Sequence, residues 1–232
     1  MTTSRRALIV GNTDGIGLAL TRRLLRDGWL VVGLSRRASP VEEAPSYRHA
    51  LADVSAAEYR LALQALLARE APFDVCVYCA GIGDLLDIND LSREAGVVRV
   101  NLIGAVETAS VVLPPMIAAG RGHFVGLSSI GDGVWSDAPS YSASKAGLSS
   151  YLEGLALRLR PRGVRITNLR FGFVDTKMAK STIRPFMITT ERAVEVILKC
   201  FRRRPARLTY PKGMAALAWL LQLMTSVRLW FA

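Results

Sequence analysis

Short apolar runs alternate with longer segments whose apolar residues recur at helical spacing over most of this chain. The runs are rich in Val, Ile and Leu, which is typical of parallel strands covered on both faces. The predicted strands are residues 7–10, 30–34, a segment ending at Asp53, 74–79, 124–127 and 164–169, with an added edge strand at 208–210. The predicted helices are residues 18–26, 55–70, 93–119 and 141–160.

This alternation predicts an α/β fold, a single-domain doubly wound parallel sheet (Rossmann-like) with helices on both faces. The chain has 232 residues, 50% of them apolar, which is enough for one such domain. No linker, repeat or low-complexity tract divides it. We therefore expect one domain over residues 1–232, with a C-terminal apolar helix as an extension at 211–232.

Local signals refine two of the helices. Ser55 and Glu58 stand at the spacing of a capping box, so a helix is expected to begin at Ser55. Pro114 and Pro115 are expected to end or kink the helix predicted at 93–119, because proline removes a helical hydrogen bond. Asn101 is a polar residue in the apolar middle of that same helix.

A glycine-rich turn joins the first strand to the first helix, with the sequence Gly11-Asn12-Thr13-Asp14-Gly15-Ile16-Gly17. Glycines let a backbone turn tightly and approach a ligand, and a helix N-terminus offers unpaired N–H groups to an anion. The spacing is Gly-x3-Gly-x-Gly and differs from the G-x-G-x-x-G dinucleotide pattern. The flanking strand and helix favour a phosphate-binding site over a turn that binds nothing.

The end of the second strand indicates which dinucleotide would bind. Ser35, Arg36 and Arg37 follow the strand at 30–34, where an acid accepts from a ribose 2′-hydroxyl and an arginine accommodates a 2′-phosphate. Because the acid is missing, we expect NADP(H) to be favoured over NAD(H). The alternative is a pair of solvated loop arginines.

Tyr141 and Lys145 lie four residues apart at the start of a predicted helix, so they share one of its faces. A phenol titrates near ~10, and a nearby ammonium stabilises its ionised form. We therefore expect Lys145 to lower the pKa of Tyr141, which makes Tyr141 a candidate general acid/base. Taken alone, such a pair more often belongs to a solvated helix face.

The position of these motifs strengthens the case for an active site. In a parallel sheet, ligands bind beyond the carboxyl ends of the strands. Segments that follow predicted strands meet at this edge: the glycine loop, Ala80-Gly81, Ser128-Ser129 and the loop beginning at Gly172. Their convergence is the strongest argument that the sequence offers.

In this order and spacing, the motifs resemble those of the short-chain dehydrogenase/reductase family over residues 5–180. The resemblance implies a catalytic tetrad of Asn101, Ser129, Tyr141 and Lys145. With the residues after the second strand, it gives the expected cofactor-binding set: Gly11, Asn12, Thr13, Asp14, Gly15, Ile16, Gly17, Ser35, Arg36, Arg37, Asp53, Val54, Cys79, Ala80, Gly81, Asn101, Tyr141, Lys145, Gly172, Val174 and Thr176.

The resemblance also implies a role for each catalytic residue. Tyr141 would exchange a proton with a carbonyl or alcohol oxygen while hydride passes to or from a nicotinamide, and Ser129 would hold that oxygen. Lys145 would bind the nicotinamide ribose, and Asn101 would hold a water that links Lys145 to solvent. Ser128 is the alternative serine, because the family spacing from serine to tyrosine is often one residue longer.

Three residues depart from the family pattern. Cys79 replaces an asparagine, Phe171 a proline and Val10 a threonine. All three lie around the expected cofactor site. We expect them to alter affinity or loop rigidity and to leave the chemistry in place.

Cysteines and net charge exclude other classes of protein. The chain has three cysteines, and Cys76 and Cys79 lie on a predicted strand where they would point to opposite faces, so we expect no disulfide framework and no metal site. The net charge of +11 favours an anionic ligand or surface. No nucleic-acid-binding module stands out, so we expect no nucleic-acid partner.

Residues 214–232 are almost wholly apolar, with Arg228 their only charge. We favour a helix that caps the substrate pocket or joins subunits. Peripheral membrane contact through this segment, helped by the basic residues 202–207 and Lys212, is the second interpretation, and a membrane-spanning tail is the third. Residues 7–10 are too short for a signal-peptide core, so we expect a cytoplasmic location.

Together these features predict an NAD(P)H-dependent oxidoreductase that interconverts a carbonyl and an alcohol, acting as a homodimer or homotetramer. The substrate pocket is expected from residues 84–91, 131–140 and 178–195, whose apolar side chains favour an apolar small molecule. Two alternatives remain: a non-catalytic dinucleotide-binding redox sensor, and an isomerase or dehydratase on the same scaffold.

Overall fold

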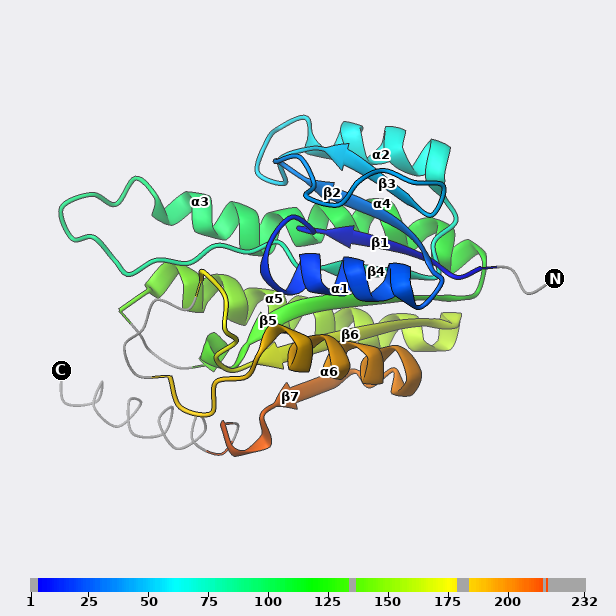
Figure 1. Ribbon diagram of the computed structural model, residues 1–232. Helices are drawn as coiled ribbons and strands as arrows, with labels where there is room; N and C mark the ends of the chain where they lie inside the picture. Colours follow the sequence, from blue (N-terminus) through cyan, green and yellow to red (C-terminus); the bar gives the residue numbers. More distant parts are fainter. Residues whose placement is uncertain (1–3, 134–136, 179–183, 215, 217–232) are drawn as a thin grey trace.

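The computed structural model describes residues 4–133, 137–178, 184–214 and 216 (Figure 1). Its centre is a seven-stranded sheet in the order β3-β2-β1-β4-β5-β6-β7, in which every neighbouring pair is parallel. The strands are β1 (Arg6–Val10), β2 (Leu30–Ser35), β3 (Tyr47–Leu51), β4 (Val75–Tyr78), β5 (Gly122–Ser129), β6 (Val164–Phe171) and β7 (Arg207–Tyr210). The predicted doubly wound parallel sheet and its added edge strand are confirmed.

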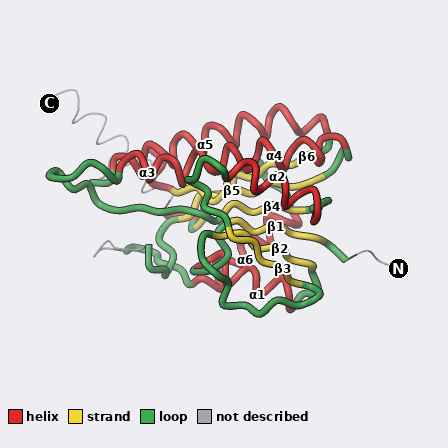
Figure 2. Tube along the Cα trace, turned by 90° about the horizontal axis from the view of Figure 1, so that it is seen from above, coloured by secondary structure: helices red, strands yellow, loops and turns green. Residues whose placement is uncertain are grey.

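Helices cover both faces of this sheet (Figure 2). One apolar core contains side chains of α2 (Tyr59–Glu70), α4 (Gly104–Ala118) and α5 (Pro139–Leu159). The other contains side chains of α1 (Gly15–Arg26) and α6 (Thr190–Arg203). Because the strands are buried from both sides, their sequences are continuous apolar runs and do not alternate with polar residues.

The order of the strands reverses beside β1. The chain builds outward from β1 to β2 and β3, returns to the other side of β1 as β4, and then continues outward to β7. The connections that leave β1 and β4 therefore diverge to opposite faces of the sheet. Such a reversal opens a crevice beyond the strand ends, where ligands bind in this architecture.

The helix predicted to begin at Ser55 begins at Tyr59, and the predicted capping box is not formed. The Asp53 carboxylate accepts hydrogen bonds from both the backbone N–H and the hydroxyl of Ser55, at 2.9 and 2.7 Å. Glu58 makes no side-chain cap. Asp53 competes successfully for the Ser55 hydroxyl, so a turn replaces the first part of the expected helix.

The long helix predicted at 93–119 has three parts: α3 (Glu94–Val98), a π-helical turn (Arg99–Ile103) and α4. Pro114 and Pro115 lie inside α4, which continues to Ala118, so the helix does not end at the prolines. Its irregularity is the π-helical turn, which contains Asn101. Single π-helical turns inside helices are frequent at functional sites.

By length and composition, the helical stretch Glu94–Ala118 could cross a membrane, and no other helix in the described part of the chain could. However, 56% of its apolar window is buried inside the protein, as in a core helix, so this is weak evidence for a membrane span. The predicted C-terminal helix lies outside the described residues from 217 onward. Met214, just before it, packs with Ile130 and Phe173.

Two leucines on α5 test whether this helix is held by burial. Leu152 is fully buried and lies directly on Gly126 of β5, whereas Leu157 is 78% exposed. We expect Leu152→Ala to lower the free energy of unfolding by about 2–5 kcal/mol, because it removes buried apolar atoms and leaves a cavity. Leu157→Ala should change it by less than about 0.5 kcal/mol. Urea unfolding measures both, and equal effects would contradict the placement of α5.

Candidate active site

The glycine loop lies against the backbone that follows β4. Gly11 has φ +86°, and a Cβ built on it would come within 2.6 Å of the Ala80 backbone nitrogen. A Cβ on Gly17 would come within 2.0 Å of the Gly11 carbonyl oxygen. Asp14 caps α1 by accepting a hydrogen bond from the Gly15 backbone N–H at 2.8 Å. Glycine is therefore required at Gly11 and Gly17 for steric reasons alone, and the loop leaves its backbone uncovered by side chains at these two positions.

Two of the residues predicted to bind a cofactor hold the loop to the sheet. Asn12 is fully buried; its backbone N–H donates to Ser35 Oγ at 3.0 Å and its amide donates to the Tyr47 hydroxyl at 2.6 Å. Tyr47 lies on β3, 35 residues away, and no local sequence pattern links it to the loop. Asn12 and Ser35 therefore position the turn.

Basic side chains gather around Asp14. Lys177 Nζ lies 3.1 Å and Arg37 3.7 Å from its carboxylate. Together with the Gly15 N–H, they hold the pKa of Asp14 below its ordinary value, the hydrogen bond from Lys177 having the largest effect. Arg36 lies near Asp53 and lowers the pKa of that carboxyl, although the Ser55 hydrogen bonds contribute more. Lys177 was not singled out from the sequence.

Lys145 is 5% exposed and its Nζ donates to the Leu127 carbonyl oxygen at 2.8 Å. Burial lowers the pKa of Lys145 to about 8. The ammonium lies 5.8 Å from the centre of the Tyr141 ring. The two residues thus share a helix face, but that face is turned into the protein and not into solvent.

The Tyr141 and Ser129 hydroxyls share a hydrogen bond. Burial is the main cause that raises the pKa of Tyr141, the negative charge of Asp132 raises it further, and the Ser129 hydrogen bond lowers it. The expectation that Lys145 makes this phenol acidic is therefore wrong. Desolvation of the phenolate outweighs an ammonium that is aimed at a backbone carbonyl.

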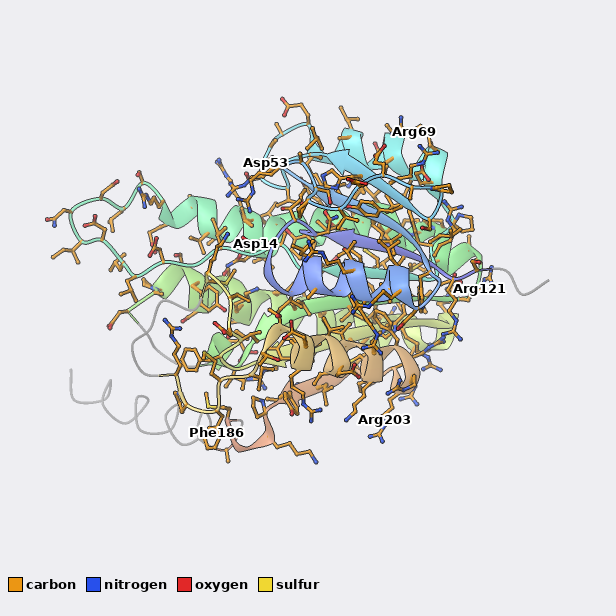
Figure 3. All side chains as sticks on the ribbon, in the orientation of Figure 1. Asp14, Asp53, Arg69, Arg121, Phe186 and Arg203 are labelled. Atoms are coloured by element: carbon orange, nitrogen blue, oxygen red, sulfur yellow. The ribbon has the colours of Figure 1, made fainter. Side chains whose placement is uncertain are left out.

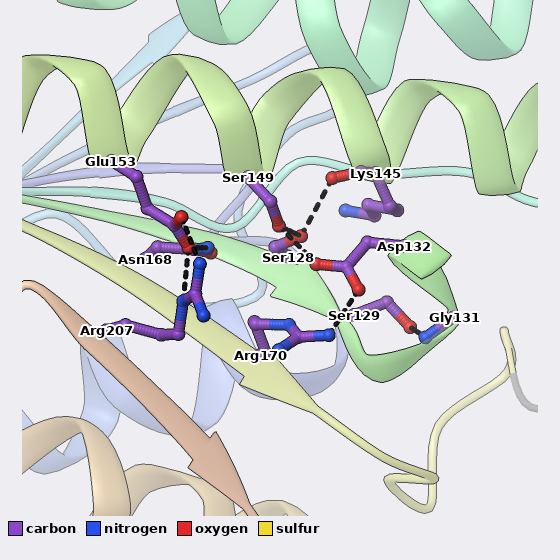
Figure 4. A network of polar contacts seen from close by, with 10 residues as sticks. All are labelled: Ser128, Ser129, Gly131, Asp132, Lys145, Ser149, Glu153, Asn168, Arg170 and Arg207. Carbon is purple, nitrogen blue, oxygen red and sulfur yellow. Dashed lines mark hydrogen bonds and ion pairs between the residues drawn. The ribbon is translucent and has the colours of Figure 1, made fainter. Parts of the chain in front are cut away.

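Of the two candidate serines, Ser129 is the one beside Tyr141. Ser128 is buried and points the other way, where its hydroxyl donates to the Lys145 carbonyl oxygen at 3.1 Å and contacts Ser149 Oγ at 2.7 Å (Figure 4). Ser129 Oγ accepts from the Gly131 backbone N–H at 3.0 Å. This bond fixes the Ser129 side chain at the end of β5.

Asn101 is fully buried, so it does not lie on an exposed face of the helix. Its amide exchanges two hydrogen bonds of 2.8 Å with the Ile82 backbone and donates a third, at 3.0 Å, to Ser144 Oγ on α5. The π-helical turn places Asn101 between the loop after β4 and the helix that carries Tyr141. Asn101 therefore joins these two parts of the site.

Short contacts connect the loops at this edge of the sheet. A Cβ on Gly81 would lie 3.4 Å from Asn101 Oδ1 and 3.6 Å from Lys145 Nζ, and one on Gly83 would lie 2.7 Å from the Tyr141 ring. A Cβ on Gly15 would lie 3.2 Å from the Thr176 methyl group. A continuous series of contacts thus runs from the glycine loop through Gly81 and Gly83 to Tyr141. The segment at Gly172–Thr176 closes against the glycine loop.

Other predicted cofactor residues have structural partners. Val54 is buried behind Gly104, and the Gly172 backbone N–H donates to the Tyr210 carbonyl at 2.9 Å. Val174 is buried in the core beside α6. Burial raises the pKa of the Cys79 thiol to about 12, so this replacement for the family's asparagine is a neutral side chain.

The cysteines are free, and Cys76 and Cys79 pack into the cores on opposite faces of the sheet, as predicted. In the described part of the chain, no group of three or more His, Cys, Asp or Glu side chains is placed to hold a metal ion. Figure 3 shows Arg69, Arg121 and Arg203 at the end of the molecule away from Asp14 and Phe186. These three arginines therefore lie far from the candidate site and from Gly213, which lies beside Phe186.

The fold and this site define a dinucleotide-binding protein of the Rossmann type. The chain belongs to the short-chain dehydrogenase family, whose family model matches residues 5–185. A curated relative from Myxococcus xanthus, an uncharacterized oxidoreductase, is 34% identical over 226 residues that cover 91% of this chain and 89% of the relative. The resemblance found in the sequence is confirmed, and the chain is an oxidoreductase of this family.

Two further relatives carry more specific names. A putative ketoacyl reductase of Streptomyces coelicolor is 33% identical over 84% of this chain and 81% of its own. A 3-ketodihydrosphingosine reductase of Bacteroides thetaiotaomicron is 30% identical over 73% of this chain and 64% of its own. A short-chain dehydrogenase of Burkholderia cenocepacia, solved in complex with NADP, has the same fold with a TM-score of 0.83 at 22% identity, over 93% of this chain and 92% of its own.

The depressed pKa of Lys145 predicts a dependence of stability on pH. Between about 8, the pKa in the folded protein, and the ordinary value of 10.5, the unfolded chain keeps a proton that the folded protein has released. The free energy of unfolding should therefore rise with pH through this window. Relative to Lys145→Met, which has no such group, the native protein should gain up to about 3 kcal/mol from pH 8 to 10.5.

Urea unfolding across this pH range provides the measurement. Lys199→Met is the matched control, because Lys199 is an exposed lysine on α6. Its difference from the native protein should not change with pH in this way. A constant difference between the native protein and Lys145→Met would contradict the burial of Lys145.

Proposed function

We propose that this chain is an NADP(H)-preferring reductase that interconverts a carbonyl and an alcohol, with Tyr141 as its general acid/base. The observation that carries the proposal is the placement of Tyr141, hydrogen-bonded to Ser129, beside Gly83, and of Lys145 beside Gly81, on the same sheet edge as the glycine loop. Proton transfer and cofactor binding would then take place in one crevice.

A dinucleotide fits the residues at this edge. The glycine loop exposes backbone where side chains would clash, and the N-terminus of α1 directs N–H groups toward the place of a pyrophosphate. Arg36 and Arg37 follow β2, where a 2′-phosphate would lie. When bound, the nicotinamide of such a cofactor supplies or accepts the hydride. NAD(H) is the alternative cofactor.

The protein's own residues supply the proton and the positioning. The Tyr141 phenol is protonated at neutral pH, because burial raises its pKa, so it donates a proton to a carbonyl oxygen in the direction of reduction. The Ser129 hydroxyl donates a hydrogen bond to the same oxygen and holds it beside Tyr141. Lys145 binds ribose hydroxyls. Asn101 joins the Ile82 backbone to α5 by hydrogen bonds. It also holds a water on the route from Lys145 to solvent.

Exposed apolar side chains beside the site favour an apolar substrate. Leu85 and Ile88, which follow Gly83, are 65% and 82% exposed, and Phe186 is 62% exposed. The Met178 methyl group approaches Gly81, where a Cβ would lie 3.5 Å from it. Two relatives are named as a 3-ketodihydrosphingosine reductase and a putative ketoacyl reductase. We infer that the substrate is a small ketone or alcohol with an apolar chain.

We further propose that the protein is a cytoplasmic homodimer or homotetramer. The apolar residues 214–232 would cover an interface or the pocket, because the chain enters them from Met214, which packs with Phe173 near the site. Peripheral membrane contact is the weaker interpretation. Arg203, one of the basic residues invoked for such contact, lies far from Phe186, which is beside Gly213 (Figure 3).

Substitution of Tyr141 tests the reaction directly. With a panel of β-keto esters and long-chain ketones, Tyr141→Phe should lower kcat/KM for NADPH oxidation by about 10²–10⁴, since it removes the general acid. Tyr151→Phe, on the same helix and half-buried, is the matched control and should retain activity. NADPH binding without NADPH consumption across the panel would favour the redox sensor. Substrate conversion without net NADPH change would favour the isomerase or dehydratase.

The arginines after β2 test the choice of cofactor. The double variant Arg36→Ala/Arg37→Ala should weaken NADPH binding by about 10–100-fold, through loss of charge-assisted hydrogen bonds, and leave NADH binding nearly unchanged. Arg202→Ala/Arg203→Ala removes the same charge at the other end of the molecule and is the control. Fluorescence titration gives both dissociation constants. An equal loss for NADPH and NADH would contradict recognition of a 2′-phosphate.

A further inference from the structure

Asp132 lies three residues after Ser129 and is the centre of a polar network that joins three elements of the site (Figure 4). Its carboxylate accepts a hydrogen bond from Ser149 Oγ on α5 at 2.5 Å and forms a hydrogen-bonded ion pair with Arg170 on β6. The side chains are largely withdrawn from water: 8% of Asp132 and 21% of Arg170 are exposed. The ion pair is therefore largely buried, unlike a solvated ion pair on the surface.

The network continues from Ser149 to the backbone of the helix that carries Tyr141. The Ser149 and Ser128 hydroxyls lie 2.7 Å apart, and Ser128 Oγ donates to the Lys145 carbonyl oxygen at 3.1 Å. Asp132 itself belongs to the 3₁₀ turn that directly follows Ser129. One carboxylate thus connects the Ser129 loop with the turn of α5 that contains Lys145.

Asp132 also acts on Tyr141 through its charge. A carboxylate opposes the ionisation of a nearby phenol, and Asp132 adds in this way to the burial that raises the pKa of Tyr141. The other charged and titratable groups around Asp132 and Tyr141 come from each element that packs here. They are Lys145 and Glu153 on α5, Cys79 after β4, Arg170 on β6 and Arg207 on β7.

We propose that Asp132 and Arg170 form a positioning pair for the active site. Asp132 fixes the Ser129 loop against α5, and Arg170 neutralises a carboxylate that would otherwise lie unpaired beside Tyr141. The proposal rests on the proposed acid/base role of Tyr141. Removal of one partner from a largely buried pair leaves an uncompensated charge whose effect on neighbouring groups is strong. The pair therefore holds the geometry of the site and keeps the negative electrostatic potential at the phenol small.

The molecule contains a matched pair for comparison. Glu153 on α5 forms an ion pair with Arg207 on β7 and accepts from the Asn168 amide at 2.7 Å (Figure 4). This pair also ties α5 to the sheet, but through Asn168 and not through the Ser128–Ser149 hydroxyls. If the Asp132–Arg170 pair acted only by holding α5 against the sheet, a substitution in either pair would have the same effect on activity.

The test measures the pH at which Tyr141 ionises in Arg170→Met, Asp132→Asn, the double variant and the Arg207→Met control. Phenolate absorbance, taken as the difference from the same protein with Tyr141→Phe, reports Tyr141 without any substrate. The pH profile of NADP⁺-dependent oxidation of a β-hydroxy ester is the second readout. Arg170→Met should move the Tyr141 transition to higher pH and lower kcat/KM at neutral pH by about tenfold.

Asp132→Asn should move the transition to lower pH, because it removes the opposing charge. The double variant should return the transition close to that of the native protein, and Arg207→Met should leave it nearly unchanged. The proposal is overturned if Arg170→Met and Asp132→Asn lower activity equally at every pH with no shift, or if Arg207→Met shifts the transition as much. Arg170→Met can fail to fold, and Asp132→Asn and the double variant then still decide. The phenolate titration needs no turnover, so its result stands even if the proposed reaction is wrong.

Discussion

The close approach of two stretches of backbone holds this site together. The Gly11 turn rests on the chain at Ala80 with no side chain between them, and the same turn is closed by the contact of Gly17 with the Gly11 carbonyl. The loop after β4 also lies against α5, where Gly81 is beside Lys145 and Gly83 is beside the Tyr141 ring. Parallel strands bring these loops to one edge, and the missing Cβ atoms allow them to touch.

Burial is the main cause of the pKa shifts of the two titratable side chains that meet there. Lys145 has been withdrawn from water, and its ammonium is compensated by a backbone carbonyl in place of a carboxylate. Tyr141 is withdrawn as well, which favours its neutral form. Burial thus favours the neutral form of both side chains, since it raises the pKa of Tyr141 and lowers that of Lys145 to about 8.

The features that could be predicted from the sequence are those that depend on local patterns of residues. Continuous apolar runs such as that before Gly11 gave the strands, because burial from both sides leaves little place for polar residues. Motif order placed Ser129, Tyr141 and Lys145 at one edge. The choice between Ser128 and Ser129 needed the structure, since only side-chain direction separates them.

Features that depend on distant partners were not predicted. Asp132 and Arg170 are 38 residues apart, and neither belongs to a motif. Ser55 had the spacing of a helix cap, yet its hydroxyl is bound by Asp53. The direction of the Tyr141 pKa shift was mistaken because helical spacing shows that Lys145 is near, but does not show how deeply the phenol is buried or where the ammonium points.

The π-helical turn Arg99–Ile103 has a consequence for insertions and deletions in this helix. Such a turn holds one residue more than an α-helical turn, and each residue rotates an α-helix by about 100°. Deletion of a single residue here would let the helix become regular, but it would rotate Asn101 relative to Ala105 and Ala109, which now lie in the core. The chain could then keep either the packing of α4 or the link from Asn101 to Ile82. The length of this segment is therefore constrained as strictly as its composition.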